Sequence, residues 1–443
     1  MPGAGATLSQ RIAAGGLQAG SGDEEIYRRD NRGWAARLGA SYDLTGKGST
    51  VLRGGYGVFY DRPFDNLWTN VRLNGPALQT YSVSAPYVNI LAPVYPVPSS
   101  FNLQDIQKFP YITWVDQGLR NAYVQSFFLG LRHEVTHGLS LEVNGAGSLG
   151  RKLITTDILN RQSNDNPQLA KILYRANQGS SDYSALTVLA RYRASRAQFQ
   201  AAYTWSHSID NQSSPIAGDF FDAKFARLTF TQSSEPPAAF TLQQDSRSDR
   251  GNSNFDQRHN LVLTSIVDLP SPGGASRLAW LGRDWRFATL ASFRTGFPYS
   301  VYGTDAVGIE NGRANVVNPS AATQERPGPG GQYLLNSAAF SDPVTTNGNL
   351  GRNSLGGPGL FNIDLSLNRA FRVKWLGEAG RLNLRADAFN FLNHANLGSP
   401  DPQLGDTLGL AMYGRKAQPT GFPGLLPLNE TARQIQLMVR VEW

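Results

Sequence analysis

The sequence predicts an all-β protein, an antiparallel sheet of about eleven strands, each about 9–14 residues long and able to cross a lipid bilayer when tilted. Apolar and polar side chains alternate with a period of two, which places the apolar ones on one face of each strand. Short and long connections alternate along the chain. No segment shows a helical pattern of comparable strength, and no run of about 18 apolar residues is present.

The composition narrows the class of protein further. The chain has 443 residues, with 41 basic and 34 acidic side chains and a net charge of +7. Charged residues make up 17%, below the roughly 25% of a typical soluble domain. Cysteine is absent, which excludes disulfides, thiolate zinc sites and cysteine nucleophiles. The basic residues are dispersed rather than gathered in a stripe, so we expect no nucleic-acid partner.

The strands can be placed in order from the alternation. Trp34–Tyr42 and Leu52–Tyr60 flank a glycine-rich turn at 45–48 and form the first hairpin. The second hairpin turns at Thr136–Gly138 and the third at Arg193–Arg196. The remaining predicted segments are Phe127–Leu131, Leu139–Val143, Leu186–Tyr192, Phe199–Trp205, Leu261–Leu269, Phe287–Phe293, Ile363–Leu367, Leu384–Ala388 and Ile435–Trp443.

The lengths of the connections favour a membrane barrel. Short turns follow Tyr42, Val135, Tyr192, Leu269 and Phe371. Long loops, each of about 35–60 residues, are expected after Tyr60, Gly147, Trp205, Val301 and Phe391; such loops are uncommon in a compact soluble domain. Short turns at one end and long loops at the other are typical of an outer-membrane β-barrel. The alternative is a soluble β-sandwich or propeller, but a propeller repeat of about 40–50 residues is not seen.

In such a barrel, the two faces of each strand would lie in different environments. The apolar face would contact lipid, and the polar face would line the lumen of the barrel. The charged side chains predicted to point inward are Arg37, Arg53, Glu142, Arg191, Arg286, Arg294, Asp364, Arg385 and Asp387.

The chain ends in an alternating segment whose last residue is aromatic, Trp443. This pattern resembles the signal that the outer-membrane assembly machinery reads. The alternative is an ordinary edge strand that happens to end the chain.

Two motifs resemble enzyme signatures but are better explained by strands. His133–His137 fits H-E-x-x-H, yet it straddles a strand end and a turn, whereas zinc proteases carry the motif on a helix. Gly145–Gly150 fits G-x-G-x-x-G, but it follows an antiparallel hairpin and no helical stripe succeeds it. We interpret it as a strand end that enters a loop.

The remaining candidate side chains form no convincing site. His207 and His259 flank a long loop and could approach each other at a barrel rim, but they lack a carboxylate partner. His394 stands apart, and neither a G-x-S-x-G elbow nor a Ser/His/Asp arrangement is present. We therefore expect no catalytic, cofactor-binding or metal-binding residues.

The first long loop is rich in aromatic residues and proline. These side chains could contact a glycan or peptide, or they could pack the loop onto the mouth of the barrel, which we favour. They are Trp68, Tyr81, Tyr87, Tyr95, Tyr111 and Trp114.

Six segments together resemble the C-terminal barrel portion of Oar-like TonB-dependent receptors, and the resemblance covers about Gly33 to Trp443. The segments are Ala36–Gly39 with Leu52–Asp61, Ala202–Asp210, Asp256–Asn260, Leu350–Gly359 and Ala388–His394. The resemblance implies a receptor in the outer membrane of a Gram-negative-type bacterium that takes up a substrate with energy delivered through TonB. Such receptors carry a signal peptide, an N-terminal carboxypeptidase-regulatory-like domain, a plug and a barrel of 22 strands.

We therefore expect residues 1–32 to be an irregular N-terminal segment and residues 33–443 to be the barrel portion of such a receptor, about half of a 22-strand barrel. No signal peptide, plug or N-terminal domain is recognised in the sequence, so we expect the chain to be a fragment. The expected partners are outer-membrane lipid, the assembly machinery and an unidentified substrate, with TonB only if a longer chain supplies a plug. The alternative function is an outer-membrane binding or adhesion protein that acts through long extracellular loops; an enzyme is not expected.

Overall fold

The fold is described from a computed structural model. Within the described residues, no helix is long and apolar enough to cross a membrane. The structure describes residues 5–15, 25–63, 71, 112–161, 165–167, 169, 171–216, 238–270, 282–303, 308–343, 347–373, 375, 377, 380–413, 415–416, 429–430 and 432–443.

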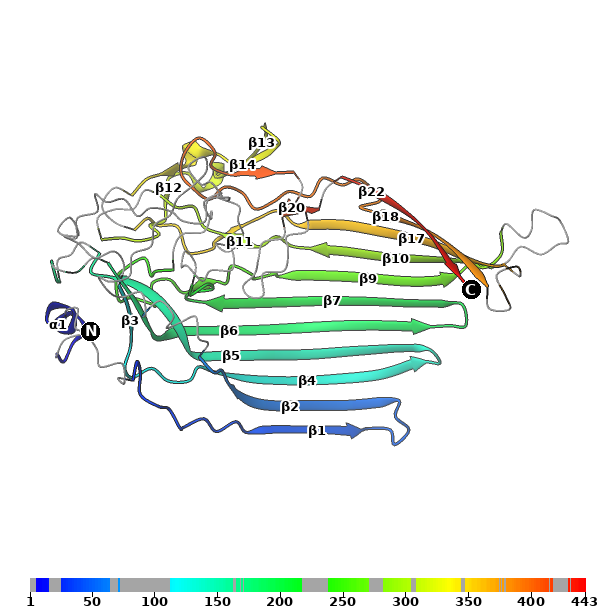
Figure 1. Cartoon of the computed structure of the whole chain (residues 1–443), viewed down its shortest axis with the longest axis horizontal. Helices are drawn as coiled ribbons and strands as arrows, with labels where there is room; N and C mark the ends of the chain where they lie inside the picture. The colour runs from blue at the N-terminus through cyan, green and yellow to red at the C-terminus, as the bar shows by residue number, and fades with distance from the viewer. Residues whose placement is uncertain are drawn as a thin grey trace, which may run out of the picture.

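Eleven long strands follow one another across a single antiparallel sheet, and all eleven predicted segments are confirmed (Figure 1). Each strand pairs with the next long strand along the chain. Short turns gather at one end of the sheet and long connections at the other, here called the turn end and the loop end. The strands are β1 (Arg37–Asp43), β2 (Thr50–Tyr60), β4 (Tyr123–Thr136), β5 (Leu139–Leu159), β6 (Ile172–Arg193), β7 (Ala197–Asp210), β9 (His259–Asp268), β10 (Trp285–Arg294), β17 (Leu360–Arg372), β18 (Arg381–Phe389) and β22 (Gln434–Glu442).

The smaller elements belong to the loop end. Two short strands join the large sheet there, β3 (Ile112–Val115) parallel to β6 and β8 (Gly251–Asn252) antiparallel to β7. The others are α1 (Leu8–Ala13), β11 (Pro298–Tyr299), β12 (Asn315–Val316), η4 (Pro319–Ala321), β13 (Thr323–Gly328), β14 (Gly331–Leu335), η5 (Ser337–Ala339), β15 (Phe340–Ser341), β16 (Leu355–Gly356), β19 (Leu410–Met412), β20 (Arg415–Lys416) and β21 (Asn429–Glu430).

One face of the sheet is largely apolar from edge to edge, because the pairing register aligns the apolar rows of neighbouring strands. Leu38 pairs with Tyr56, which pairs with Phe127, and at the other edge Leu384 pairs with Val439. Aromatic side chains stand at both ends of this face, as in the girdles of membrane barrels. They are Tyr60, Tyr123, Trp205, Phe293 and Phe361 near the loop end, and Tyr42, Tyr192, Phe199, Trp285 and Phe371 near the turn end.

The glycine motif at Gly145–Gly150 lies inside β5, so its interpretation as a strand end was wrong. Gly147 pairs with Phe127 of β4, and a Cβ atom added to Gly147 would overlap the Phe127 ring. Gly55 has the same relation to Phe128, with a built Cβ 2.7 Å from Cε1 of that ring. These glycines leave space for aromatic rings to lie over a neighbouring strand.

The long loop expected after Gly147 was also wrong. β5 continues to Leu159 and β6 begins at Ile172, so both strands extend well beyond the apolar band. Side chains from loop segments cover these extensions, and residues 155–159 are all buried. Alternation is lost because both faces of the strand are buried, and the sequence pattern therefore hid the strand.

The N-terminal segment is not wholly irregular, because α1 forms within it. The side chains of Thr7 and Gln10 cap the helix reciprocally in a capping box. Ile12 packs into a buried cluster with Ile112 and Trp114 of β3 and with the extensions of β5 and β6. Of the six aromatic residues noted in the first long loop, Trp114 is therefore packed, as predicted; the other five lie outside the described residues.

The sheet is open in the described part of the chain, because β1 and β22 lie at opposite edges and do not pair with each other. Both edge strands are largely exposed, with Leu38 at 76% and Leu437 at 76%. The eleven strands alternate in direction, so β1 and β22 both run from the loop end toward the turn end. Trp443 follows β22 directly at the turn end.

Candidate functional site

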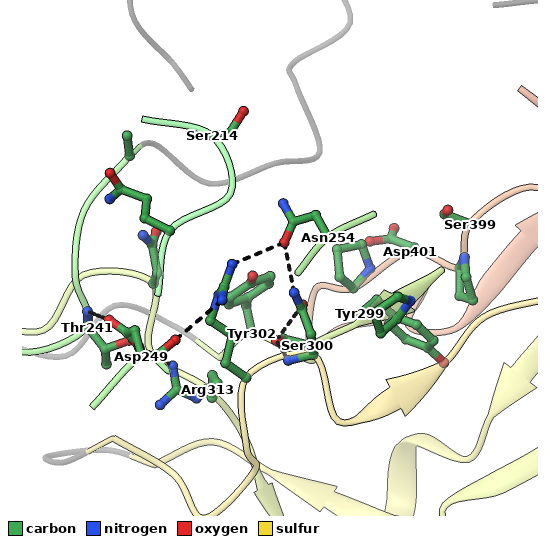
Figure 2. Close-up of a pocket in the computed structure, with 18 of the residues that line it drawn as sticks. Ser214, Thr241, Asp249, Asn254, Tyr299, Ser300, Tyr302, Arg313, Ser399 and Asp401 are labelled. Carbon is green, nitrogen blue, oxygen red and sulfur yellow. Dashed lines mark hydrogen bonds and ion pairs between the residues drawn. The ribbon is translucent and has the colours of Figure 1, made fainter. Parts of the chain in front are cut away.

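A cavity of about 400 Å³ lies among the connections at the loop end of the sheet, and we call it the loop-end cavity (Figure 2). Its volume is in the range of small-ligand pockets, roughly 300–1,000 Å³. Met412 in its wall is 50% exposed, so the cavity reaches the molecular surface. The wall draws on five stretches of chain, 211–214, 238–254, 298–313, 352–353 and 399–412.

Hydrogen bonds and an ion pair hold Arg352 in the wall of the cavity. This residue lies in one of the segments that carried the family resemblance. Its guanidinium donates to Asp210 Oδ1 at 2.8 Å and to Ser213 Oγ at 2.9 Å. The two charged side chains are only 12% and 5% exposed. Asp210 ends β7, so this ion pair ties the loop to the top of the sheet.

A second buried ion pair joins Arg313 to Asp249 at 2.6 Å, with both side chains at most 7% exposed. Asp249 also accepts from the backbone N–H and the hydroxyl of Thr241, at 2.6 and 2.8 Å. Arg313 donates from Nε to the carbonyl of Leu350 at 2.9 Å. Both charges are satisfied, which offsets the cost of burying them.

A third pair lies just outside the cavity and anchors the same loops to β5. Asp157 accepts from Arg161 Nη2 at 2.9 Å and from the backbone N–H groups of Phe240 and Gln244. Arg161 also donates to the carbonyl of Thr241 at 2.7 Å. The loop end is therefore a built structure held by charge-assisted hydrogen bonds, which are the stronger kind.

Several polar groups of the wall remain available to a ligand. Asn254 Oδ1 accepts from Asn353 Nδ2 at 2.8 Å and from Arg352, and its Nδ2 makes no hydrogen bond to the described residues. The carboxylate of Asp401 accepts from Gln403 N and Thr407 Oγ1 and keeps further acceptor capacity. Burial raises the pKa of Tyr299 to about 12, so its hydroxyl stays protonated at neutral pH.

The polar face of the sheet carries the charged side chains predicted to point inward, and the register places all nine of them on that face. Arg53 pairs with Glu142, which also accepts from Asn144 Nδ2 at 2.7 Å. Arg385 pairs with Asp387 at 2.8 Å. Charges on this face are therefore cross-linked between and along strands.

The H-E-x-x-H motif straddles a strand end and a turn, as predicted. His133 lies in β4, where its Nδ1 is 2.8 Å from Thr50 Oγ1, and His137 lies in the turn that follows. His207 contacts Asn252 and Arg258, whereas His259 contacts Tyr203, so the two rings at the rim have separate partners. In the part of the chain that is described, no group of three or more His, Asp and Glu side chains could hold a metal ion.

Comparison with known proteins identifies the family. The profile of the family described as "Outer membrane beta barrel domain" matches residues 4–436, and the chain belongs to this family. The protein is therefore an outer-membrane β-barrel protein, as predicted. The closer resemblance to Oar-like receptors is consistent with this family and stays a prediction.

Solved structures are similar to this chain at low sequence identity. The outer membrane transporter YddB from Escherichia coli aligns with a TM-score of 0.51 and 11% identity over 90% of this chain. The FrpB iron transporter from Neisseria meningitidis (TM-score 0.42, 10% identity, 91% of this chain) and the pyoverdine receptor FpvA from Pseudomonas aeruginosa (0.43, 10%, 92%) also match. The chain spans only 39%, 38% and 36% of the lengths of these three chains. No curated protein matches by sequence.

The sequence did not reveal the loop-end cavity, because its walls come from connections without periodic pattern. Arg352 and Asn353 were part of a segment that carried the family resemblance, and Asp210 of another. Polar residues in such segments were the one available signal. Their convergence depends on contacts between residues more than 100 positions apart, such as Arg352 with Asp210.

Proposed function

We propose that this chain is part of an outer-membrane receptor barrel that takes up a solute, with the polar face of the sheet lining the lumen and the loop-end cavity at its outer mouth. The observation that carries the proposal is the difference between the two faces. One face is apolar with aromatic side chains at both ends, and the other carries paired charges such as Arg53 and Glu142. A soluble sandwich would bury its apolar face, whereas Leu38 and Leu437 are exposed here.

The direction of the two edge strands supports closure by further strands. Unpaired edges cannot face lipid, because their N–H and C=O groups would lack hydrogen-bond partners. β1 and β22 run in the same direction, so antiparallel closure requires an odd number of additional strands. Eleven more would give 22, the number in large outer-membrane transporters. We therefore propose that this chain contributes about half of such a barrel.

Two partners follow from this proposal. The outer-membrane assembly machinery would insert the barrel by reading β22 and Trp443. TonB would supply energy only through a plug domain contributed by a longer chain. Enzymatic activity is not part of the proposal.

The lumen assignment can be tested with single cysteines, because the natural chain contains none. Thr264 and Leu263 are adjacent in β9, and the register places Thr264 on the polar face and Leu263 on the apolar face. In cells expressing the reading frame that contains this chain, Thr264→Cys should react with a membrane-impermeant charged maleimide, whereas Leu263→Cys should not. Equal labelling at both positions would show that the polar face does not line an aqueous lumen.

Uptake itself is tested in the native bacterium by comparing depletion of solutes from a defined medium. Disruption of the reading frame should slow the depletion of at least one solute, and deletion of TonB should have the same effect. The second candidate function would be favoured by a different result. In that case the disrupted strain would deplete every solute normally but would fail to bind a surface that wild-type cells bind. That candidate is a binding or adhesion protein, which the organised loop end also supports.

A further inference from the structure

We propose that the loop-end cavity binds a neutral, hydroxyl-rich ligand of saccharide type. This inference rests on the proposed function, because it names the class of substrate that the receptor would recognise at its outer mouth. Asn254, Tyr299 and Asp401 come from different segments and gather at one side of the cavity (Figure 2).

The charges of the wall argue against an anionic ligand. The two arginines of the wall are already bound, Arg313 to Asp249 and Arg352 to Asp210, each through short ion pairs between buried side chains. Recruiting either guanidinium to a phosphate or carboxylate would leave a buried aspartate uncompensated, which is costly. Asp401 would add repulsion to any anion.

A simple cation is also a poor match for the wall. Asp401 offers an acceptor, but the Asn254 amide, also in the wall, is oriented by the bond that its Oδ1 accepts from Asn353 at 2.8 Å, so Nδ2 remains as a donor. The Tyr299 hydroxyl remains protonated, since burial raises the pKa of Tyr299 to about 12. An ammonium group has donors only and would find donors facing it.

A hydroxyl group matches this wall because it donates and accepts at once. Adjacent hydroxyls of a saccharide could accept from Asn254 Nδ2 and donate to Asp401, while the rings of Tyr299 and Tyr302 offer apolar faces with polar edges. The volume of about 400 Å³ lies near the lower end of ligand pockets, roughly 300–1,000 Å³, so the ligand would be small.

The test uses protein purified from the outer membrane in lauryl dimethylamine oxide, because detergents with sugar headgroups would compete for the site. Binding of maltose, cellobiose, xylobiose and chitobiose is measured by saturation-transfer NMR and calorimetry, beside glucose 6-phosphate and spermidine as charged probes. At least one neutral disaccharide should bind, and the charged probes should not.

Three variants change one atom or group each. Asn254→Asp keeps the acceptor that faces Arg352 and Asn353 but removes the donor, Tyr299→Phe removes the hydroxyl, and Asp401→Asn removes the charge. Asn254→Asp and Tyr299→Phe should weaken disaccharide binding at least tenfold. Tyr413→Phe is the matched control, because Tyr413 is exposed and does not line the cavity; it should bind normally.

The outcomes separate this inference from the proposed function. If the cavity variants lose disaccharide binding and no uptake depends on TonB, the saccharide site is supported and the transport function is refuted. Uptake of another solute without disaccharide binding would overturn the saccharide site alone. Preferential binding of spermidine, or disaccharide binding that all three variants leave unchanged, would also refute the saccharide site. Heat-modifiable migration in gels confirms that each variant is folded.

Discussion

Arginine in place of Leu365 should destabilise the barrel, because this side chain lies near the middle of the apolar face. Leu365 of β17 pairs with Thr289 and Ala388, both on that face. Phe361 and Phe371 mark the two ends of the apolar face in the same strand. The ten steps from Phe361 to Phe371 span about 33 Å along the strand at roughly 3.3 Å per residue.

The depth of Leu365 sets the magnitude of the effect. At a tilt of about 40°, the span of about 33 Å corresponds to a membrane thickness of about 25 Å, the height of the apolar band in such barrels. Leu365 is four residues from Phe361 and so lies about 10 Å below that end, within a few ångströms of the midplane. Arginine there should cost about 2–4 kcal/mol of unfolding free energy.

The neighbouring position provides a matched control. Ser366 points to the polar face, where it pairs with Asp387, and Asp364 lies two residues away on the same face. Ser366→Arg places its charge beside these carboxylates, so we expect a change below about 1 kcal/mol.

The unfolding free energy of both variants is measured by guanidinium titration of the protein in lipid vesicles, with tryptophan fluorescence as the signal. The amount of folded barrel in outer membranes of expressing cells is a second measure that does not require reversible unfolding. Equal losses for Leu365→Arg and Ser366→Arg would refute the assignment of the two faces, and so would a larger loss for Ser366→Arg.

Three further predictions concern the ends of the barrel. Asp249→Ala leaves Arg313 buried without its partner and should cost about 3–5 kcal/mol in the loop end, measured as faster proteolysis of the loops on intact cells; unchanged proteolysis would contradict the role of the pair. Hydrogen bonds from Gly48 N–H and Thr45 lower the pKa of Asp43, which ends β1 just beyond Tyr42 at the turn end. The stabilisation by the Asp43 carboxylate is therefore complete above the usual pKa near 3.8 and is lost as the pH falls through the folded pKa. Asp43→Asn should abolish that part of the acid dependence in a pH series of unfolding titrations, and an identical pH profile would count against it. Deleting Trp443 should reduce insertion in cells far more than it lowers the stability of refolded barrel, and normal insertion would leave Trp443 only as an interface anchor.

The eleven long strands were predictable because a strand in a membrane barrel has one apolar and one polar face. The last strand shows this clearly, with Ile435, Leu437, Val439 and Val441 alternating with polar neighbours or Met438. The alternation of apolar and polar residues did not predict the extensions of the strands beyond the apolar band. Residues 155–159 of β5 are buried on both faces, so their strand left no alternation to read. α1 was missed because a helix of six residues presents too short a pattern, although its capping box was present in the sequence.

Periodicity is a local property, so the sequence alone was sufficient for the eleven long strands and their two faces. The loop-end cavity depends on contacts that no local pattern encodes. Arg352 reaches Asp210 across 142 positions, and Arg313 reaches Asp249 across 64. These pairs depend on the sheet, because it brings the connections beside β7, β9, β10 and β17 to one end. A buried charge is stable only where its partner lies close to it.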